Sequence, residues 1–125
     1  MDYPTFIKKE AEKAGLPKDQ AESVAHATLR TLADRITGGE ADDLAAQLPQ
    51  PLKADLLKDQ ADAEPFDVDE FVRRVSERAQ VDENTARTGA TAVLDTVREA
   101  VTPGEFDDVT AQLPKEYREL VGPMS

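Results

Sequence analysis

The chain is similar to itself when it is shifted by 65 residues, and this internal similarity limits its possible folds more than any other sequence feature. Residues 2–57 align with residues 67–122 without a gap, and 18 of the 56 aligned positions are identical. Typical residue frequencies would give roughly three or four identities. We therefore expect a tandem duplication with a first repeat over residues 1–57, a linker over 58–65 and a second repeat over 66–125. The two repeats could pack as one globular domain.

Apolar residues recur at the spacing of amphipathic helices throughout both repeats. The longest apolar stripe lies on the second predicted helix of each repeat. Its members are Ala21, Ala25, Leu29, Leu32 and Ile36, and their counterparts are Ala86, Ala90, Leu94, Val97 and Val101. No stretch of strand length alternates between apolar and polar residues. The sequence predicts an all-α fold of about eight helices, four in each repeat.

A Thr-x-x-Glu sequence precedes the third predicted helix of each repeat, at Thr37 to Glu40 and at Thr102 to Glu105. This spacing predicts a capping box, in which the Thr hydroxyl accepts from one free backbone N–H and the Glu side chain reaches back to another. A Gln-Leu-Pro sequence then ends the helix, because proline disfavours helical geometry in the residue before it. We expect a buried Leu at this corner and a Gln that satisfies free carbonyls.

The composition excludes several classes of function. The chain has 125 residues, with 26 acidic and 15 basic side chains and a formal net charge of −11. Non-specific affinity for nucleic acid comes from Lys and Arg, so this balance argues against a nucleic-acid partner. Without cysteine, disulfide frameworks, thiolate zinc sites and cysteine nucleophiles are excluded.

Charged residues are spread along the whole chain. The longest run without Asp, Glu, Lys or Arg is nine residues, 44–52, and it is interrupted by proline. We therefore expect no membrane span and no signal peptide, and a cytoplasmic location.

The order of the motifs resembles a known family. Two copies of an Ala-rich helical hairpin, followed by Gly-Glu, Asp-Asp and Gln-Leu-Pro, are similar to the bacterial family catalogued as domain of unknown function 2267, over nearly the whole chain. The resemblance implies a small all-α cytoplasmic protein, and it carries over no catalytic residue.

A second, local resemblance involves residues 11–16, Ala-Glu-Lys-Ala-Gly-Leu, and the helix that ends in Gly39-Glu40. They are similar to the N-terminal helical hairpin of the histone-like HU proteins, in which the hairpin builds the dimer and later basic arms grip DNA. At the place of those arms this chain has Asp-Asp at 42–43 and Gln-Leu-Pro at 47–49. The resemblance therefore implies a way of packing helices and not DNA binding.

The chain has one histidine, His26, which follows Ser23 by three residues and Asp19 by seven on one predicted helix. These residue types could supply a base, a nucleophile and an orienting group, but a single helical face rarely gives them triad geometry. The counterpart of His26 in the second repeat is Thr91, so the arrangement is not repeated. We expect no catalytic residue.

Acidic residues follow both capping sequences. They are Glu40, Asp42 and Asp43 in the first repeat, and Glu105, Asp107 and Asp108 in the second. Carboxylates are ligands of Mg²⁺ and Ca²⁺, but negative charge in the first turn is also favoured by the helix dipole. Because no calcium-loop spacing occurs, the sequence favours capping, with no metal ligand and no cofactor. An enzyme or metal-dependent hydrolase that used these acids would require them to converge in a pocket, with raised pKa values or a bound ion.

The Gln-Leu-Pro sequences are the least generic peptide motif and provide the candidate interaction residues. These are Gln47, Leu48, Pro49, Gln112, Leu113 and Pro114. The leading hypothesis is a non-enzymatic helical binding or assembly module that acts on a protein partner or by self-association, without nucleic acid, membrane or cofactor. The alternatives are a metal-dependent enzyme that uses the repeated carboxylates, and a nucleoid-associated protein.

Overall fold

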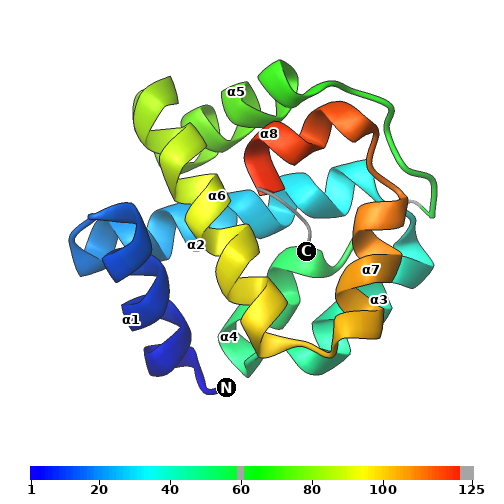
Figure 1. Ribbon diagram of the computed structural model, residues 1–125, viewed down its shortest axis with the longest axis horizontal. Helices are drawn as coiled ribbons and strands as arrows, with labels where there is room; N and C mark the ends of the chain where they lie inside the picture. The colour runs from blue at the N-terminus through cyan, green and yellow to red at the C-terminus, as the bar shows by residue number, and fades with distance from the viewer. Residues whose placement is uncertain (59–60, 122–125) are drawn as a thin grey trace.

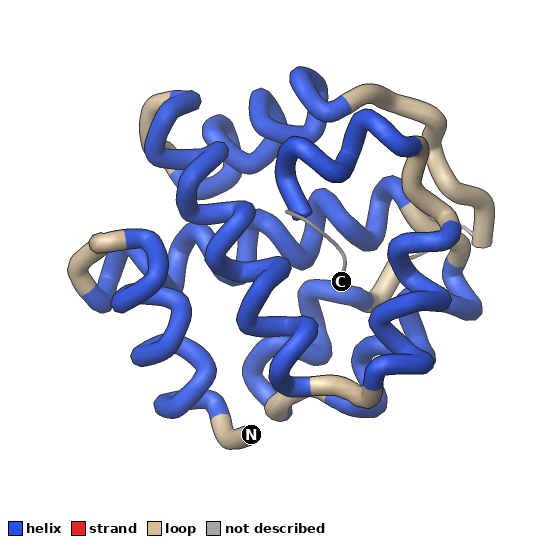
Figure 2. The backbone as a smooth tube through the Cα atoms, in the orientation of Figure 1, coloured by secondary structure: helices blue, strands red, loops and turns tan. Residues whose placement is uncertain are grey.

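The structure is a computed structural model that describes residues 1–58 and 61–121. Within these ranges the regular secondary structure is entirely helical, as Figures 1 and 2 show. Eight α-helices and two short 3-10 helices, η1 and η2, are present in this part of the chain. The prediction of an all-α fold is confirmed.

The helices recur with the 65-residue offset seen in the sequence. Helices α1 (Tyr3–Ala14) and α5 (Val68–Ala79) have 12 residues each. Helices α2 (Lys18–Arg35) and α6 (Glu83–Ala100) have 18 residues each. The shorter elements are α3 (Gly38–Gln47), α4 (Gln50–Lys53), η1 (Ala54–Leu56), α7 (Pro103–Ala111), η2 (Lys115–Tyr117) and α8 (Arg118–Val121).

The two halves of the chain, residues 1–57 and 66–121, interlock. Helix α1 packs against α6, α5 packs against α2, and both contacts are more extensive than those of α1 with α2 or of α5 with α6. Helices α2 and α6 also contact each other, and α3 lies beside α7 (Figure 1). The first helix of each half therefore makes its most extensive contact with a helix of the other half.

The contact between α2 and α6 involves two equivalent positions. Gly89 follows Val24 by 65 residues, and a Cβ atom on Gly89 would lie 2.6 Å from Val24 Cγ1. Only a residue without a side chain leaves room for Val24 there. Equivalent positions meet each other where two similar units are related by an approximate two-fold axis.

One hydrophobic core extends through both halves. Phe6 and Phe71, which are equivalent, are both fully buried, as are Leu29 and Leu120. Burying each of these side chains stabilises the fold by about 1.5–3 kcal/mol. Glu10 is also fully buried, although its counterpart in the second half is Val75.

The first helices of the two halves begin at capping aspartates, and the first of them ends at a glycine. Asp2 accepts a hydrogen bond from Thr5 N and Asp67 accepts one from Glu70 N, each at 2.9 Å, so both are N-caps. Gly15 ends α1 in the left-handed conformation with φ of 68°. These short-range signals set the lengths of α1 and α5.

The described ends of the linker contact the end of α2. Lys58 donates to the carbonyls of Ala33 and Ile36 at 2.8 and 2.7 Å, and Glu64 N donates to Asp34 O.

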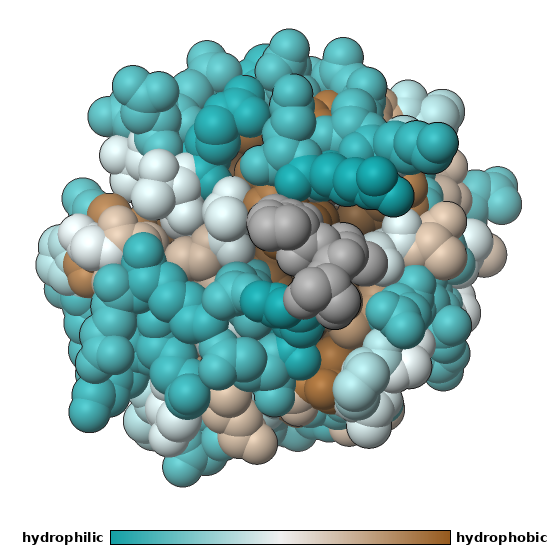
Figure 3. All heavy atoms as spheres, in the orientation of Figure 1, coloured by the Kyte–Doolittle hydropathy of each residue, from teal (hydrophilic) through white to brown (hydrophobic). Residues whose placement is uncertain are grey.

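The face of the molecule drawn in Figure 3 is mostly hydrophilic, with small separate apolar areas. No helix in the described ranges is sufficiently long and apolar to cross a membrane.

Candidate metal centre

Helices α3 and α7 begin with equivalent threonine caps. Thr37 Oγ1 accepts from Glu40 N, and Thr102 Oγ1 accepts from Glu105 N, both at 3.3 Å. Each Thr adopts an extended backbone conformation. Its hydroxyl satisfies one of the free backbone N–H groups at the start of the helix that follows. The threonine half of both predicted capping boxes is confirmed.

The glutamate half of the capping box is replaced by a contact between the two halves of the chain. Thr37 N donates to Gln112 Oε1 at 2.8 Å, and Thr102 N donates to Gln47 Oε1, also at 2.8 Å. The glutamine side chains were expected to satisfy free carbonyls, but both accept from N–H groups. Gln47 lies at the end of α3 and accepts from the cap residue that begins α7, whereas Gln112 lies at the end of α7 and accepts from the cap residue that begins α3.

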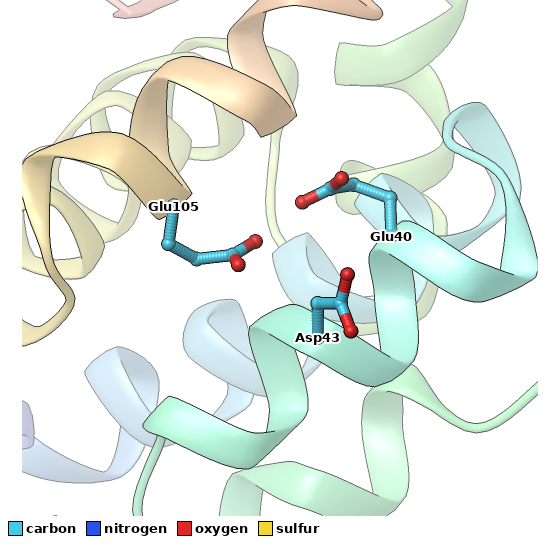
Figure 4. A group of neighbouring side chains, drawn as sticks. All are labelled: Glu40, Asp43 and Glu105. Carbon is cyan, nitrogen blue, oxygen red and sulfur yellow. The ribbon is translucent and has the colours of Figure 1, made fainter.

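The glutamates that would complete the capping boxes point toward each other instead. Figure 4 shows Glu40 and Asp43 on α3, and Glu105 on α7, directed to a common point. One carboxylate oxygen from each of the three residues lies within 4.8 Å of the other two. This cluster, which we call the carboxylate site, contains ligands from both halves of the chain.

The three carboxylates differ in burial. Glu105 is only 9% exposed, Glu40 is half-buried and Asp43 is exposed. Glu105 Oε2 and Glu40 Oε1 are buried and find no donor among the groups of the described part of the chain. Each of these oxygens is therefore available to a proton shared between the two glutamates or to a cation.

The electrostatics of the site favour uptake of positive charge. Burial, and then a side-chain hydrogen bond with Glu105, raise the pKa of Glu40 to about 8, and repulsion from the charges of Glu105, Asp108 and Asp43 contributes further. Facing carboxylates can relieve such repulsion by sharing a proton or by binding a cation. Oxygen-only ligand sets suit the hard cations Mg²⁺, Ca²⁺ and Mn²⁺.

The other predicted acids do not join the carboxylate site. Asp42 and Asp107 are exposed on the surfaces of α3 and α7. Asp108 is also exposed, and it is close enough to Glu40 to help raise its pKa. The repeated acids are thus divided between an outward-facing set and a converging set, a division that the sequence alone does not reveal.

His26 belongs to a different network from the one considered in the sequence. Its Nε2 lies 3.1 Å from the Tyr3 hydroxyl, and its Nδ1 pairs with the Asp55 carboxylate. Ser23 and Asp19 are exposed, and within the described ranges neither side chain forms a hydrogen bond with His26. The Asp55 hydrogen bond raises the pKa of His26 above 6.5.

Sequence reasoning did not identify Tyr3 and Asp55 as partners of His26, or Glu10 as a buried acid. A signal was available in the alignment of the two halves, because the counterparts of Tyr3, Asp55 and Glu10 are Val68, Leu120 and Val75. A polar residue aligned with an apolar counterpart marks a position where the two halves differ. The His26 network therefore belongs to the first half alone, whereas the carboxylate site is common to both.

The candidate interaction residues have mixed accessibility. Leu48 is buried, Pro49 and Leu113 are half-buried, and Pro114 is exposed. Leu113 and Pro114 line a hollow of about 320 Å³ beside Tyr117. Gln47 and Gln112 are used within the chain, as described above.

The fold and site define an all-α protein whose two interlocked halves enclose a carboxylate site between paired helices. The chain belongs to the family of uncharacterized conserved proteins designated DUF2267, whose family model matches residues 3–120. The predicted resemblance to that family is confirmed, and the resemblance to the HU proteins stays a prediction. No curated protein matches the sequence.

Proposed function

We propose that this chain is a non-enzymatic helical binding module whose ligand is a hard divalent cation. Glu40, Asp43 and Glu105 would supply the protein ligands, and water would complete the coordination shell. The observation that carries the proposal is the convergence of three carboxylates, two of which have a buried oxygen without a partner. A bound cation would satisfy those oxygens and remove the repulsion between Glu40 and Glu105.

The composition of the site suits the binding of a cation. The residues that converge are all carboxylates, and carboxylate oxygens are the ligands that hard divalent cations prefer. A cation held between α3 and α7 would connect the two halves of the chain. Such an ion stabilises the folded state by its binding free energy, because the unfolded chain has no assembled site.

The proposal includes the origin of the site by tandem duplication. Glu40 and Glu105 are equivalent in the 65-residue alignment, and so are the threonine caps and the glutamines that contact them. An approximate two-fold arrangement brings equivalent side chains together near its axis. Duplication would therefore turn one acidic helix start into a paired carboxylate site.

A protein partner at the Gln-Leu-Pro sequences has less structural support. Both glutamine side chains accept hydrogen bonds within the chain, and Leu48 is buried in the core. Self-association and protein binding stay predictions. The cation is favoured because Glu40 and Glu105 each have a buried oxygen that finds no donor among the groups of the described ranges.

The test is a titration of the protein with Mn²⁺, with free Mn²⁺ measured by electron paramagnetic resonance at constant ionic strength. We expect one saturable site per chain. Glu105→Gln and Asp43→Asn should each weaken binding by about tenfold or more, because affinity depends on ligand charge. Asp42→Asn is the matched control, since it removes the same charge from an exposed position on α3.

Two results would overturn the proposal. One is the absence of saturable binding in the wild-type chain. The other is an equal loss of affinity in Asp42→Asn and Asp43→Asn, which would show that cations only screen the net charge of −11. Competition by Ca²⁺ and Mg²⁺ then identifies the preferred cation.

A further inference from the structure

The carboxylate site depends on where the capping-box glutamates point. In a complete capping box, the glutamate at the third helical position accepts from the backbone N–H of the cap residue. Glu40 occupies that position after Thr37, and Glu105 occupies it after Thr102. Local geometry alone would thus turn both carboxylates back onto their own helix starts.

Glutamines from the opposite half occupy those N–H groups. Gln112 accepts from Thr37 N at 2.8 Å and its Nε2 donates to Thr37 Oγ1 at 3.2 Å, so it holds both polar groups of the cap. Gln47 accepts from Thr102 N in the equivalent contact. A backbone N–H that already has an acceptor at this distance offers little to a second one.

We infer that Gln112 and Gln47 are positioning residues for the carboxylate site: they take the cap N–H groups and so direct Glu40 and Glu105 toward each other. This inference rests on the proposed cation-binding function and adds the residues that orient its ligands. Neither glutamine touches the cation. Each acts through a threonine cap, as partners that orient metal ligands commonly do.

The placement of these glutamines explains a feature of the motif. Pro49 and Pro114 end the helices immediately after the Gln-Leu pair, because a residue before proline avoids helical geometry. Gln47 is the last residue of α3, and Gln112 is the C-cap residue that follows the last residue of α7. The Gln-Leu-Pro sequence thus puts an amide at the point where one helix ends beside the start of the other.

The test compares Mn²⁺ affinity in Gln112→Met and Gln112→Glu with that of the wild-type chain. Methionine has a similar length but only a weak acceptor, so Gln112→Met should lose about tenfold or more in affinity. Glutamate keeps an oxygen acceptor for Thr37 N, so Gln112→Glu should retain the wild-type affinity. Asp82→Ala is the matched control for stability, because it removes an N-cap at the start of α6, away from the site.

A crystal structure of metal-free Gln112→Met gives a readout that needs no cation. We expect the Glu40 carboxylate to lie within hydrogen-bond distance of Thr37 N. A Glu40 side chain that still faces Glu105 would overturn the inference, as would an equal loss of affinity in Asp82→Ala. If Gln112→Met does not fold, Gln47→Met provides the same test through Glu105. If the wild-type chain does not bind Mn²⁺, the proposed function fails, while the orientation of Glu40 still decides this inference.

Discussion

Val24 and Gly89 meet where α2 contacts α6, and a Cβ atom on Gly89 would lie only 2.6 Å from Val24 Cγ1. The two positions are equivalent in the 65-residue alignment, yet one has a branched side chain and the other has none. The pair shows how two similar halves can interlock without steric conflict. The Val24 side chain of the first half fills the space that is left by the missing side chain at Gly89 in the second half.

Gly89→Val should destabilise the fold strongly, because the new side chain overlaps Val24. Overpacking of this kind typically costs about 1–3 kcal/mol. The exchanged double variant, Val24→Gly with Gly89→Val, should recover part of the loss, since volume is restored on the opposite helix. Chemical unfolding of the wild type, Gly89→Val, Val24→Gly and the double variant measures the coupling. A double variant whose loss equals the sum of the two single losses would contradict the arrangement.

Glu10→Leu should stabilise the protein. Glu10 is fully buried, both of its oxygens lack a partner in the described ranges, and burial raises its pKa to about 9. Removing this unpaired group should gain about 1–3 kcal/mol. The native chain retains a proton that the unfolded chain releases near pH 4.5, so wild-type stability falls as the pH rises from about 4.5 to about 9.

Urea unfolding at several pH values tests the Glu10 prediction. The Glu10→Leu variant should lose most of this decline with pH. Glu12→Leu, at an exposed position on the same helix, is the control and should leave the decline unchanged. Equal pH profiles for wild type and Glu10→Leu would show that another group causes the decline.

The His26 network predicts a pH dependence limited to the first half. The hydrogen bond to Asp55 raises the pKa of His26 above 6.5, so its stabilising contribution is complete below pH 6.5. That contribution is lost as the pH rises through the raised native pKa. The stability difference between wild type and His26→Asn should therefore shrink as the pH rises above about 6.5. Thr91→Ala, at the equivalent position of the second half, should show a constant difference.

The pKa of Glu40 predicts that cation binding releases a proton. With a pKa of about 8, the Glu40 carboxyl is mostly protonated at pH 7, whereas a cation binds the carboxylate. Binding at pH 7 should therefore release up to about one proton per Mn²⁺. Calorimetry in two buffers with different ionisation enthalpies measures this number. Binding without proton release would place the cation away from Glu40.

Much of the fold could be predicted because its signals are local or repeated. Asp2 and Asp67 each cap a helix by accepting from a backbone N–H only three residues further along the chain. Gly15 ends α1 at a position that requires the left-handed conformation. The 65-residue offset extends the same assignments to the second half. Helix existence and bounds therefore followed from spacing and caps.

The carboxylate site could not be predicted in the same way. The contacts of Gln112 with Thr37 and of Gln47 with Thr102 span 75 and 55 residues, and no local rule connects them. Without those contacts, Thr37 to Glu40 is indistinguishable from an ordinary capping box. The orientation of Glu40 depends on how the halves pack, which periodicity does not specify.

An anomalous difference map from crystals grown with Mn²⁺ tests the central claim most directly. Our account predicts one strong peak between α3 and α7, at coordination distance from oxygens of Glu40, Asp43 and Glu105. The same map from Glu105→Gln crystals should lack that peak, whereas Asp42→Asn crystals should retain it. A wild-type map with no peak between these helices would contradict the account, and the hydrogen bond between Glu40 and Glu105 would then reflect a proton that the two carboxyl groups share.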